Sequence, residues 1–330
     1  MTQSVVEAYK QLYHYTTAKG LNGIVESQQL RATNISYLND SEELTGFFNR
    51  RLLHLLEEPI RAHFTDMQTT TSGRTYIDAE GGLEHVVTQS ITKLGALLRS
   101  HTLKFHAPHV TSFCAASPQD PDDGLLSQWR GYGPDGGYAI VFETHRLQQL
   151  IDQLPDTYLY QFGCWGDVEY YDQDSNEKAA HSETLEREAT VKQTIRTFVR
   201  DPSNSNAFCE LYAPITALSC MHKHRGFREE AEVRIVAVPA NDEVFEAAQK
   251  RGNKKPKHPV HFVEKHGVLV PYIMLFGDKS SGTATKLPIS KVIVGTHPEK
   301  FKRQKAVDLM LKQHGIKAEV TVSDIPYLDH

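Results

Sequence analysis

The chain has 330 residues, of which 39% are apolar and 23% are charged, the composition of an ordinary globular protein. Its net charge of −5 excludes a general electrostatic attraction to nucleic acid or to an anionic membrane. Four cysteines without paired spacing, no apolar run of membrane-spanning length and no signal-peptide pattern lead us to expect a reduced, cytoplasmic protein.

The chain begins with a short strand and a helix. Residues 12–16 are rich in aromatic side chains, which is typical of a strand. Thr16 and Thr17 follow, and a hydroxyl at this place can cap the helix that we predict near residues 18–28. Apolar residues three and four apart give that helix one buried face.

A long helical insert is predicted at about residues 41–108, before the next strand at 109–115. Asn39 to Glu42 most simply form a turn and a helix cap, although their polar groups could also face a pocket. Helical spacing of apolar residues then continues to about residue 66, and a second helix is predicted at 83–104. The polar residues 67–82 between them predict a loop.

The middle of the chain combines a loop with aromatic residues. Residues 116–136 are rich in Pro, Asp and Gly and include Trp129 and Tyr132 between glycines, so we predict a loop that a ligand can approach closely. An apolar strand is predicted at 137–142.

The stretch at residues 230–236 predicts a strand with an unusual face. Glu230, Glu232 and Arg234 lie two apart and so project from one face, whereas Val233 and Ile235 project from the other. Buried charges are costly unless they are paired or used in function. We therefore take this strand as the centre of a candidate site.

The C-terminal residues predict a strand at 289–294, a helix at 299–314 and a strand at 318–322, together a βαβ-type unit at about 286–330. Strands and helices alternate without a regular βα repeat along the rest of the chain. We therefore expect an α+β fold in a single domain, 1–330.

Several stretches, taken in order, resemble a bacterial family catalogued as domain of unknown function 2971. They are the following: His14-Tyr15-Thr16, Leu38-Asn39-Asp40-Ser41-Glu42, Ser127-Gln128-Trp129-Arg130-Gly131-Tyr132, Gly137-Tyr138-Ala139-Ile140-Val141-Phe142, Phe227-Arg228-Glu229-Glu230-Ala231-Glu232-Val233-Arg234, Ile293-Val294-Gly295 and Ser323-Asp324-Ile325-Pro326-Tyr327. The chain departs from the family pattern at Gly295-Thr296-His297-Pro298, where Gly-Pro is usual, and at Leu328, where a basic residue is expected.

A second resemblance suggests an activity. A first strand with His and Thr, a middle segment with aromatic residues and a late strand with Glu-x-Glu are similar to the three-part pattern of ADP-ribosyltransferases. This resemblance implies a split mixed or antiparallel sheet with helical insertions and NAD as co-substrate. It also implies that Glu232 stabilises the positive ribose of the transition state while Glu230 orients or deprotonates the acceptor.

The same resemblance implies contacts with NAD from these residues: His14, Tyr15, Thr16, Asn39, Trp129, Arg130 and Tyr132. His14 would bind the adenosine ribose, and Trp129 or Tyr132 would stack on nicotinamide. Arg130, Arg225 or Arg228 would meet the pyrophosphate. The acceptor would be DNA, RNA or protein, and a toxin or defence effector of this kind would have an antitoxin or immunity partner.

Other interpretations of these residues remain open. The charges of the late strand can form an ion-pair ladder on a solvated face, and His14 and Trp129 can be core residues. The alternative function is a non-catalytic nucleotide- or nucleic-acid-binding module on the same fold. An enzyme that uses NAD to remove an RNA phosphate is disfavoured because it would need several Arg and His in the pocket. We predict no metal site, since Cys220 to His224 straddle a helix end without a Cys-x-x-Cys pair.

Overall fold

The computed structural model describes residues 4–38, 42–105, 108–115, 123–132, 136–171, 181–277 and 286–325. The chain divides into two compact units. The helical unit contains Asn34–Pro108 and Glu169–Arg225, and the sheet unit contains Gln3–Thr33, His109–Val168 and Gly226–His330. Mixed helix and strand confirm the α+β class.

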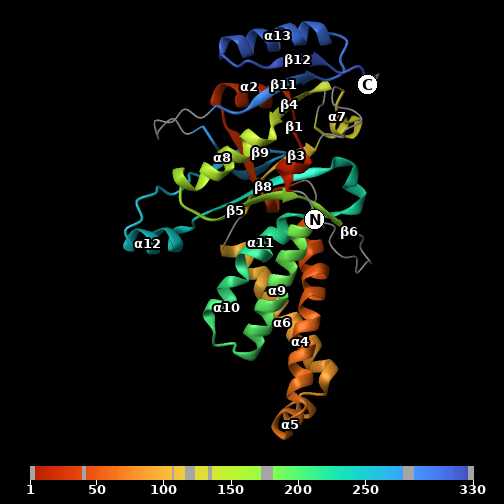
Figure 1. Ribbon diagram of the computed structural model, residues 1–330, viewed down its shortest axis with the longest axis vertical. Coiled ribbons are helices and arrows are strands. Elements are labelled where there is room, and N and C mark those ends of the chain that lie inside the picture. Colours follow the sequence, from red (N-terminus) through yellow and green to blue (C-terminus); the bar gives the residue numbers. More distant parts are fainter. Residues whose placement is uncertain are drawn as a thin grey trace. The chain divides into compact units, whose positions relative to one another are not determined.

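The sheet unit is built on a ten-stranded sheet (Figure 1). Its main path runs β12-β11-β4-β1-β3-β2-β10-β9, and β8 pairs with β3 and β5. The strands are β1 (Gln11–Thr16), β2 (Leu30–Asn34), β3 (His109–Ala115), β4 (Tyr138–Glu143), β5 (Tyr160–Asp167), β8 (Glu232–Pro239), β9 (His261–Lys265), β10 (Val268–Leu275), β11 (Ile289–Val294) and β12 (Glu319–Val322). The sheet is mixed because β11 and β12 are parallel whereas β1, β3, β4 and β8 pair antiparallel.

Strand β3 is the branch point of this sheet. It pairs with β8 along its length, from His109 to Cys114. It pairs with β1 only at its end, where Leu12 faces Ala115 and Tyr13 faces Cys114. The pairing of β1 with β4 continues to Thr16, so β1 and β3 begin to separate beside His14.

Helices of the sheet unit are α1 (Val5–Ala8), α2 (Ala18–Ser27), α7 (Leu126–Tyr132), α8 (Thr144–Thr157), α12 (Asp242–Lys250) and α13 (Lys300–Gln313). The predicted cap of α2 is confirmed, since the Thr17 hydroxyl accepts a hydrogen bond from the Gly20 amide. The C-terminal strand–helix–strand order is also confirmed. The loop predicted at 116–136 contains α7, a short helix that the flanking glycines concealed.

Apolar residues cover both faces of the sheet near β1. One face packs Leu12, Phe113, Ile140 and Val233 into the largest core. The opposite face carries a smaller core that includes Tyr13, Tyr15, Cys114, Trp129, Ala139, Val141 and Ile293. Adjacent residues of β1 therefore belong to different cores, as the alternation of side chains along a strand requires.

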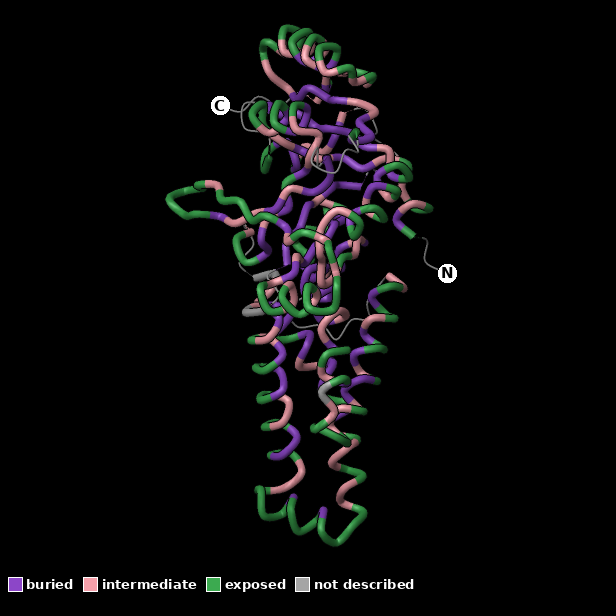
Figure 2. Tube along the Cα trace, turned by 90° about the vertical axis from the view of Figure 1, so that its left-hand side faces the viewer, coloured by how far each residue is buried: buried purple, intermediate pink, exposed green. Residues whose placement is uncertain are grey.

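The helical unit consists of long helices and one small sheet. Its helices are α3 (Glu42–Gly46), a π-helix (Phe47–Arg51), α4 (Leu52–Met67), α5 (Thr71–Ala79), α6 (Leu83–Phe105), α9 (Ser182–Arg200), α10 (Ser205–Glu210) and α11 (Tyr212–Cys220), preceded by a 3-10 turn at Ile35–Tyr37. Strands β6 (Glu169–Tyr171) and β7 (His222–His224) pair in parallel. In Figure 2 the buried residues of the long helices form stripes along one side of each helix.

Two stretches far apart in the sequence share this core. Helix α4 packs on both α6 and α9, with Leu55, Ile60 and Val87 meeting Val191 and Ile195. The predicted insert at 41–108 therefore does not form the core of the helical unit alone. Residues 169–225, whose helices have apolar faces of their own, complete that core. Every helix in the described part of the chain is too short or too polar to cross a membrane.

The prediction of a loop at 67–82 is wrong, because this stretch contains α5. The Thr70 hydroxyl accepts a hydrogen bond from the Gly73 amide, which caps the helix. Ile77 is fully buried and anchors the helix. Burial of Ile77 thus stabilises a helix in a segment whose polar composition predicts a loop.

Candidate functional site

The candidate site lies where β8 begins, beside β3. Glu232 and Arg234 are buried, with exposed fractions of 5% and 1%. Arg234 Nε donates to Glu232 Oε1 at 2.6 Å, and its Nη2 donates to Oε2 at 3.1 Å. Two buried charges persist in a core only with such pairing. Arg234 therefore holds the Glu232 carboxylate in place.

Glu230 does not belong to the strand, so the prediction that it projects beside Glu232 from one strand face is wrong. A 3-10 turn spans Arg225–Glu230, and β8 begins only at Glu232. Ala231 between them has a φ of +40°, a left-handed conformation that breaks the alternation of side chains.

Cys114 of β3 nevertheless lies near both carboxylates. Burial raises the pKa of the Cys114 thiol to about 12, and the charges of Glu230 and Glu232 act in the same direction. The register places Cys114 directly opposite Glu232 on one side and Tyr13 on the other. Such a thiol stays protonated and is a poor nucleophile at neutral pH.

His14 lies one strand away, where the pairing of β1 with β3 ends. Its Nδ1 is 3.0 Å from the Ser112 carbonyl oxygen, so Nδ1 carries the proton. Burial lowers the pKa of His14, against the opposing effect of that hydrogen bond. The neutral ring therefore keeps Nε2 as a hydrogen-bond acceptor.

The register separates His14 from Glu232 by face. Glu232 shares its face with Cys114 and Tyr13, whereas His14 alternates with Tyr13 and packs against Phe113 at 5.9 Å between ring centroids. His14 and Glu232 therefore project from opposite faces of the sheet. Both are attached through β3, and Ser112, which binds His14, pairs with Arg234.

Tyr15 and Trp129 are core residues. The Tyr15 hydroxyl accepts a hydrogen bond from the Leu125 amide at 2.8 Å. The Trp129 ring meets Tyr15 edge-on at 4.8 Å, and Trp129 is only 2% exposed. An indole with both faces in the core cannot stack on nicotinamide, so that prediction for Trp129 is replaced by a structural role.

Thr16 ends β1 with its side chain against the first turn of α2. A Cβ atom added to Gly20 would come within 1.9 Å of the Thr16 hydroxyl oxygen. Arg130 and Tyr132 lie on α7 and are exposed, Tyr132 by 42%. Arg225 and Arg228 are exposed on the turn before β8. Asn39 lies outside the described residues.

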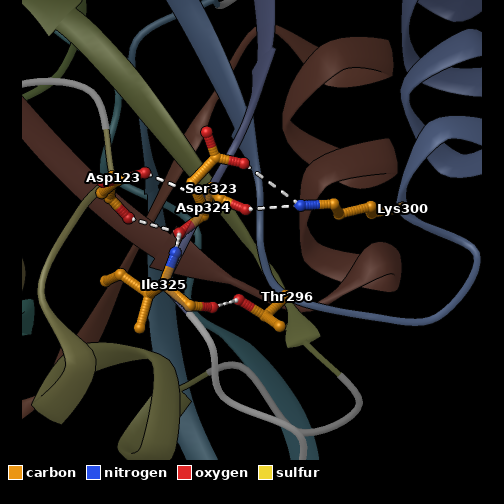
Figure 3. Close-up of polar contacts among 6 residues, drawn as sticks. All are labelled: Asp123, Thr296, Lys300, Ser323, Asp324 and Ile325. Atoms are coloured by element: carbon orange, nitrogen blue, oxygen red, sulfur yellow. Dashed lines mark hydrogen bonds and ion pairs between the residues drawn. The ribbon is translucent and has the colours of Figure 1, made fainter.

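Asp123 is the centre of a hydrogen-bonded cluster that joins α7 to the segment after β12 (Figure 3). The Asp123 carbonyl accepts from Trp129 Nε1 at 3.0 Å and from the Ser323 hydroxyl at 2.9 Å. Its carboxylate accepts from the Asp324 amide at 2.7 Å. Lys300 Nζ donates to the Ser323 carbonyl and to the Asp324 carboxylate, each at 3.2 Å. These contacts hold α7 to the segment after β12.

The comparisons with known proteins bear on this part of the chain. Residues 128–235 match the family described as Protein of unknown function (DUF2971). The predicted family is thereby confirmed over this segment. The match begins beside Trp129 and ends after Arg234, so it contains Glu232 and residues 128–132 of α7. No curated protein and no solved structure matches the chain.

Sequence reasoning missed Cys114 and Asp123 as parts of these clusters. Cys114 could have been found from strand alternation, because a residue two after Ser112 shares its face. Asp123 gave no signal, since its partners Ser323 and Asp324 lie 200 and 201 positions later. Within the described ranges, no group of three or more His, Cys, Asp or Glu is placed to hold a metal ion.

Proposed function

We propose that the sheet unit transfers ADP-ribose from NAD, with Glu232 as the carboxylate at the reacting ribose. The observation that carries this proposal is the order of strands. The strands with His14 and Glu232 both pair with β3, so two of the three segments similar to the transferase pattern lie on strands on either side of β3. This supports a split-sheet fold of the ADP-ribosyltransferase type.

The reaction breaks the bond between the ribose C1′ and the nicotinamide nitrogen, and nicotinamide leaves with the electron pair. The carbon gains positive charge, which a carboxylate withdrawn from water stabilises strongly. Arg234 fixes the Glu232 carboxylate with two hydrogen bonds, so little reorganisation is needed during the reaction. The acceptor then bonds to C1′, and its proton passes to a base such as Glu230.

The substrate contacts follow from the exposed residues. Arg130 and Tyr132 are exposed on α7, where a guanidinium suits the pyrophosphate of NAD and a phenol ring suits a base. We propose that the acceptor is DNA, RNA or protein, and that the protein acts as a toxin with an antitoxin partner.

One observation favours the second candidate, a nucleotide-binding module without catalysis. Glu232 already makes a bidentate ion pair with Arg234, which satisfies much of its hydrogen-bonding capacity. A carboxylate with that role stabilises the fold, and other groups contact the ribose of NAD. In this case NAD would bind without release of nicotinamide.

The test is incubation of the protein with NAD labelled in the adenylate phosphate, with and without cell lysate. Nicotinamide release and label transfer are measured for wild type, Glu232→Gln and the control Glu143→Gln, an exposed carboxylate of the same unit. We expect Glu232→Gln to lower nicotinamide release by about 100-fold, as removal of one transition-state contact typically does.

Nuclease and protease treatment of the labelled product identifies the acceptor. Tryptophan fluorescence confirms folding of each variant, because both tryptophans, Trp129 and Trp165, belong to the sheet unit. Binding of NAD without turnover in wild type supports the binding module. Equal nicotinamide release by folded Glu232→Gln and wild type refutes the transferase proposal.

A further inference from the structure

Three flat side chains form a stacked row across β2, β10 and β9. The Arg31 guanidinium of β2 lies over the Tyr272 ring of β10, 4.2 Å from the ring centroid. The His261 imidazole of β9 stacks on the same ring, with 5.5 Å between centroids and 29° between planes. Because β10 lies between β2 and β9 in the sheet, Tyr272 is the central member that orients the other two.

The stacked row turns away from the largest core. Ala32 and Ile273 are paired neighbours on β2 and β10 and are buried in that core. Arg31 and Tyr272 precede them by one residue each, so their side chains project from the opposite face of the sheet. Arg31 and His261 are exposed and Tyr272 is half-buried. The row is therefore accessible to a ligand.

The candidate carboxylate lies on the same side of the sheet as the stacked row. Val233 of β8 belongs to the same core as Ala32, and β3 joins β8 to β2 within the sheet. Glu232 alternates with Val233 and so projects from the face that carries the row. A chain molecule bound to the row can extend towards Glu232 without passing around an edge of the sheet.

The charges on this face favour an anionic ligand. Lys265 is exposed on the same face of β9 as His261. The one carboxylate within β2, β9 and β10 is Glu264, which projects from the opposite face and accepts from the Gly267 amide at 2.6 Å. Within the described ranges neither Arg31 nor Lys265 has an ion-pair partner. Cations without nearby carboxylates attract a polyanion locally, although the net charge of the chain is −5.

We propose that the stacked row binds single-stranded nucleic acid. Unpaired bases present flat faces that stack on imidazole and guanidinium groups, whereas the bases of a duplex already stack on one another. Arg31 and Lys265 meet the backbone phosphates. As a surface that presents the acceptor, the row rests on the ADP-ribosyl transfer proposed above and narrows its acceptor to nucleic acid. The binding itself needs no NAD.

Fluorescence anisotropy of labelled single strands of about 10 nucleotides, titrated with the full chain, tests this surface. We expect His261→Leu and Arg31→Gln each to raise the Kd by about tenfold, as the loss of one stacked base does. Arg31→Gln should also reduce the slope of log Kd against log salt by about 0.7, because one phosphate contact is lost. Arg31→Lys should restore that slope but only part of the affinity, since an ammonium has no flat face.

Two matched controls separate the stacked row from a general effect of substitution. Phe262→Leu changes an aromatic residue that is 62% exposed on the opposite face of β9. Arg146→Gln changes an arginine that is 62% exposed elsewhere in the same unit. Both should leave the Kd unchanged. All the substituted side chains are exposed, so every variant should retain the circular dichroism of wild type.

The choice of strand identifies the source of the bases. RNA and DNA of one sequence offer the same bases, and tighter binding of RNA would show that the 2′-hydroxyl is also contacted. A duplex of that sequence should bind at least about tenfold more weakly, because its bases are not available for stacking. Equal affinity for the duplex overturns the proposal. Displacement of the strand by polyglutamate as effectively as by unlabelled strand also overturns it, and indicates an acidic protein instead.

Failure of this proposal is distinguishable from failure of the transferase proposal, because the titration contains no NAD. Strand binding that depends on Arg31 and His261, without nicotinamide release in the assay above, refutes the transfer and retains the nucleic-acid surface. Wild type that binds no strand at about 0.1 mM protein overturns the surface even where nicotinamide is released. Folded His261→Leu and Arg31→Gln with unchanged Kd values overturn it equally.

Discussion

Replacement of Arg234 by Met should strongly destabilise the sheet unit. The change removes the guanidinium from a side chain that is 1% exposed and leaves the Glu232 carboxylate buried without its bidentate partner. Loss of one partner from a buried pair costs about 3–5 kcal/mol, because the remaining charge is neither solvated nor paired. Most domains have only about 5–15 kcal/mol of stability, so this is a large fraction.

Urea unfolding followed by tryptophan fluorescence measures the effect in this unit. Trp165 lies on β5 opposite Ile235, next to the pairing of Gly166 with Arg234. A loss of this size should lower the urea midpoint by about 1–2 M. Arg146→Met is the control, since Arg146 is 62% exposed and its pair with Glu143 spans 3.4 Å. It should change the free energy of unfolding by less than about 1 kcal/mol.

The double variant Glu232→Met, Arg234→Met isolates the unpaired charge. An apolar pair of similar volume commonly restores the stability of a buried ion pair, so the double variant should be much more stable than Arg234→Met alone. An unchanged midpoint in Arg234→Met would refute the burial argument. A double variant as unstable as the single one would show that an unpaired carboxylate is not the cause.

Two further predictions concern backbone packing and pH. Gly295→Ala should destabilise the sheet unit by about 1–3 kcal/mol or more, because the added Cβ would lie 1.5 Å from the Gly136 carbonyl oxygen. Gly23→Ala is its control in a helix, where nothing lies within 4 Å, and fluorescence-detected melting should show equal or higher stability. Burial lowers the pKa of His222 to about 3, so this residue is neutral in the fold down to that pH, whereas the unfolded chain protonates it below about pH 6.5. The free energy of unfolding should therefore fall as the pH decreases from 6.5 toward 3, by up to about 1.4 kcal/mol per pH unit. His222→Phe should flatten that slope in urea unfolding followed at 222 nm, and parallel slopes for variant and wild type would contradict the assignment.

The sequence by itself determined the elements whose signals are local. Thr17 and the apolar spacing of residues 21–25 predicted α2, and the alternation of Val233 and Ile235 predicted the apolar face of β8. The charged face of that strand was also predicted correctly for Glu232 and Arg234, although not for Glu230. The periodicity of apolar residues shows which side of a segment is apolar, and this side is the same however the rest of the chain folds.

Only the tertiary structure decided how these elements combine into sites. The positive φ of Ala231 removes Glu230 from the strand, and the packing of Trp129 on Tyr15 turns an expected ligand contact into a core residue. Pairing register places His14 and Glu232 on different faces of the sheet, on two strands that flank β3. The contact of Arg31 with Tyr272 joins segments more than 240 positions apart. Such contacts depend on the burial of apolar surface shared by distant segments, and no local pattern of residues records which segments will share it.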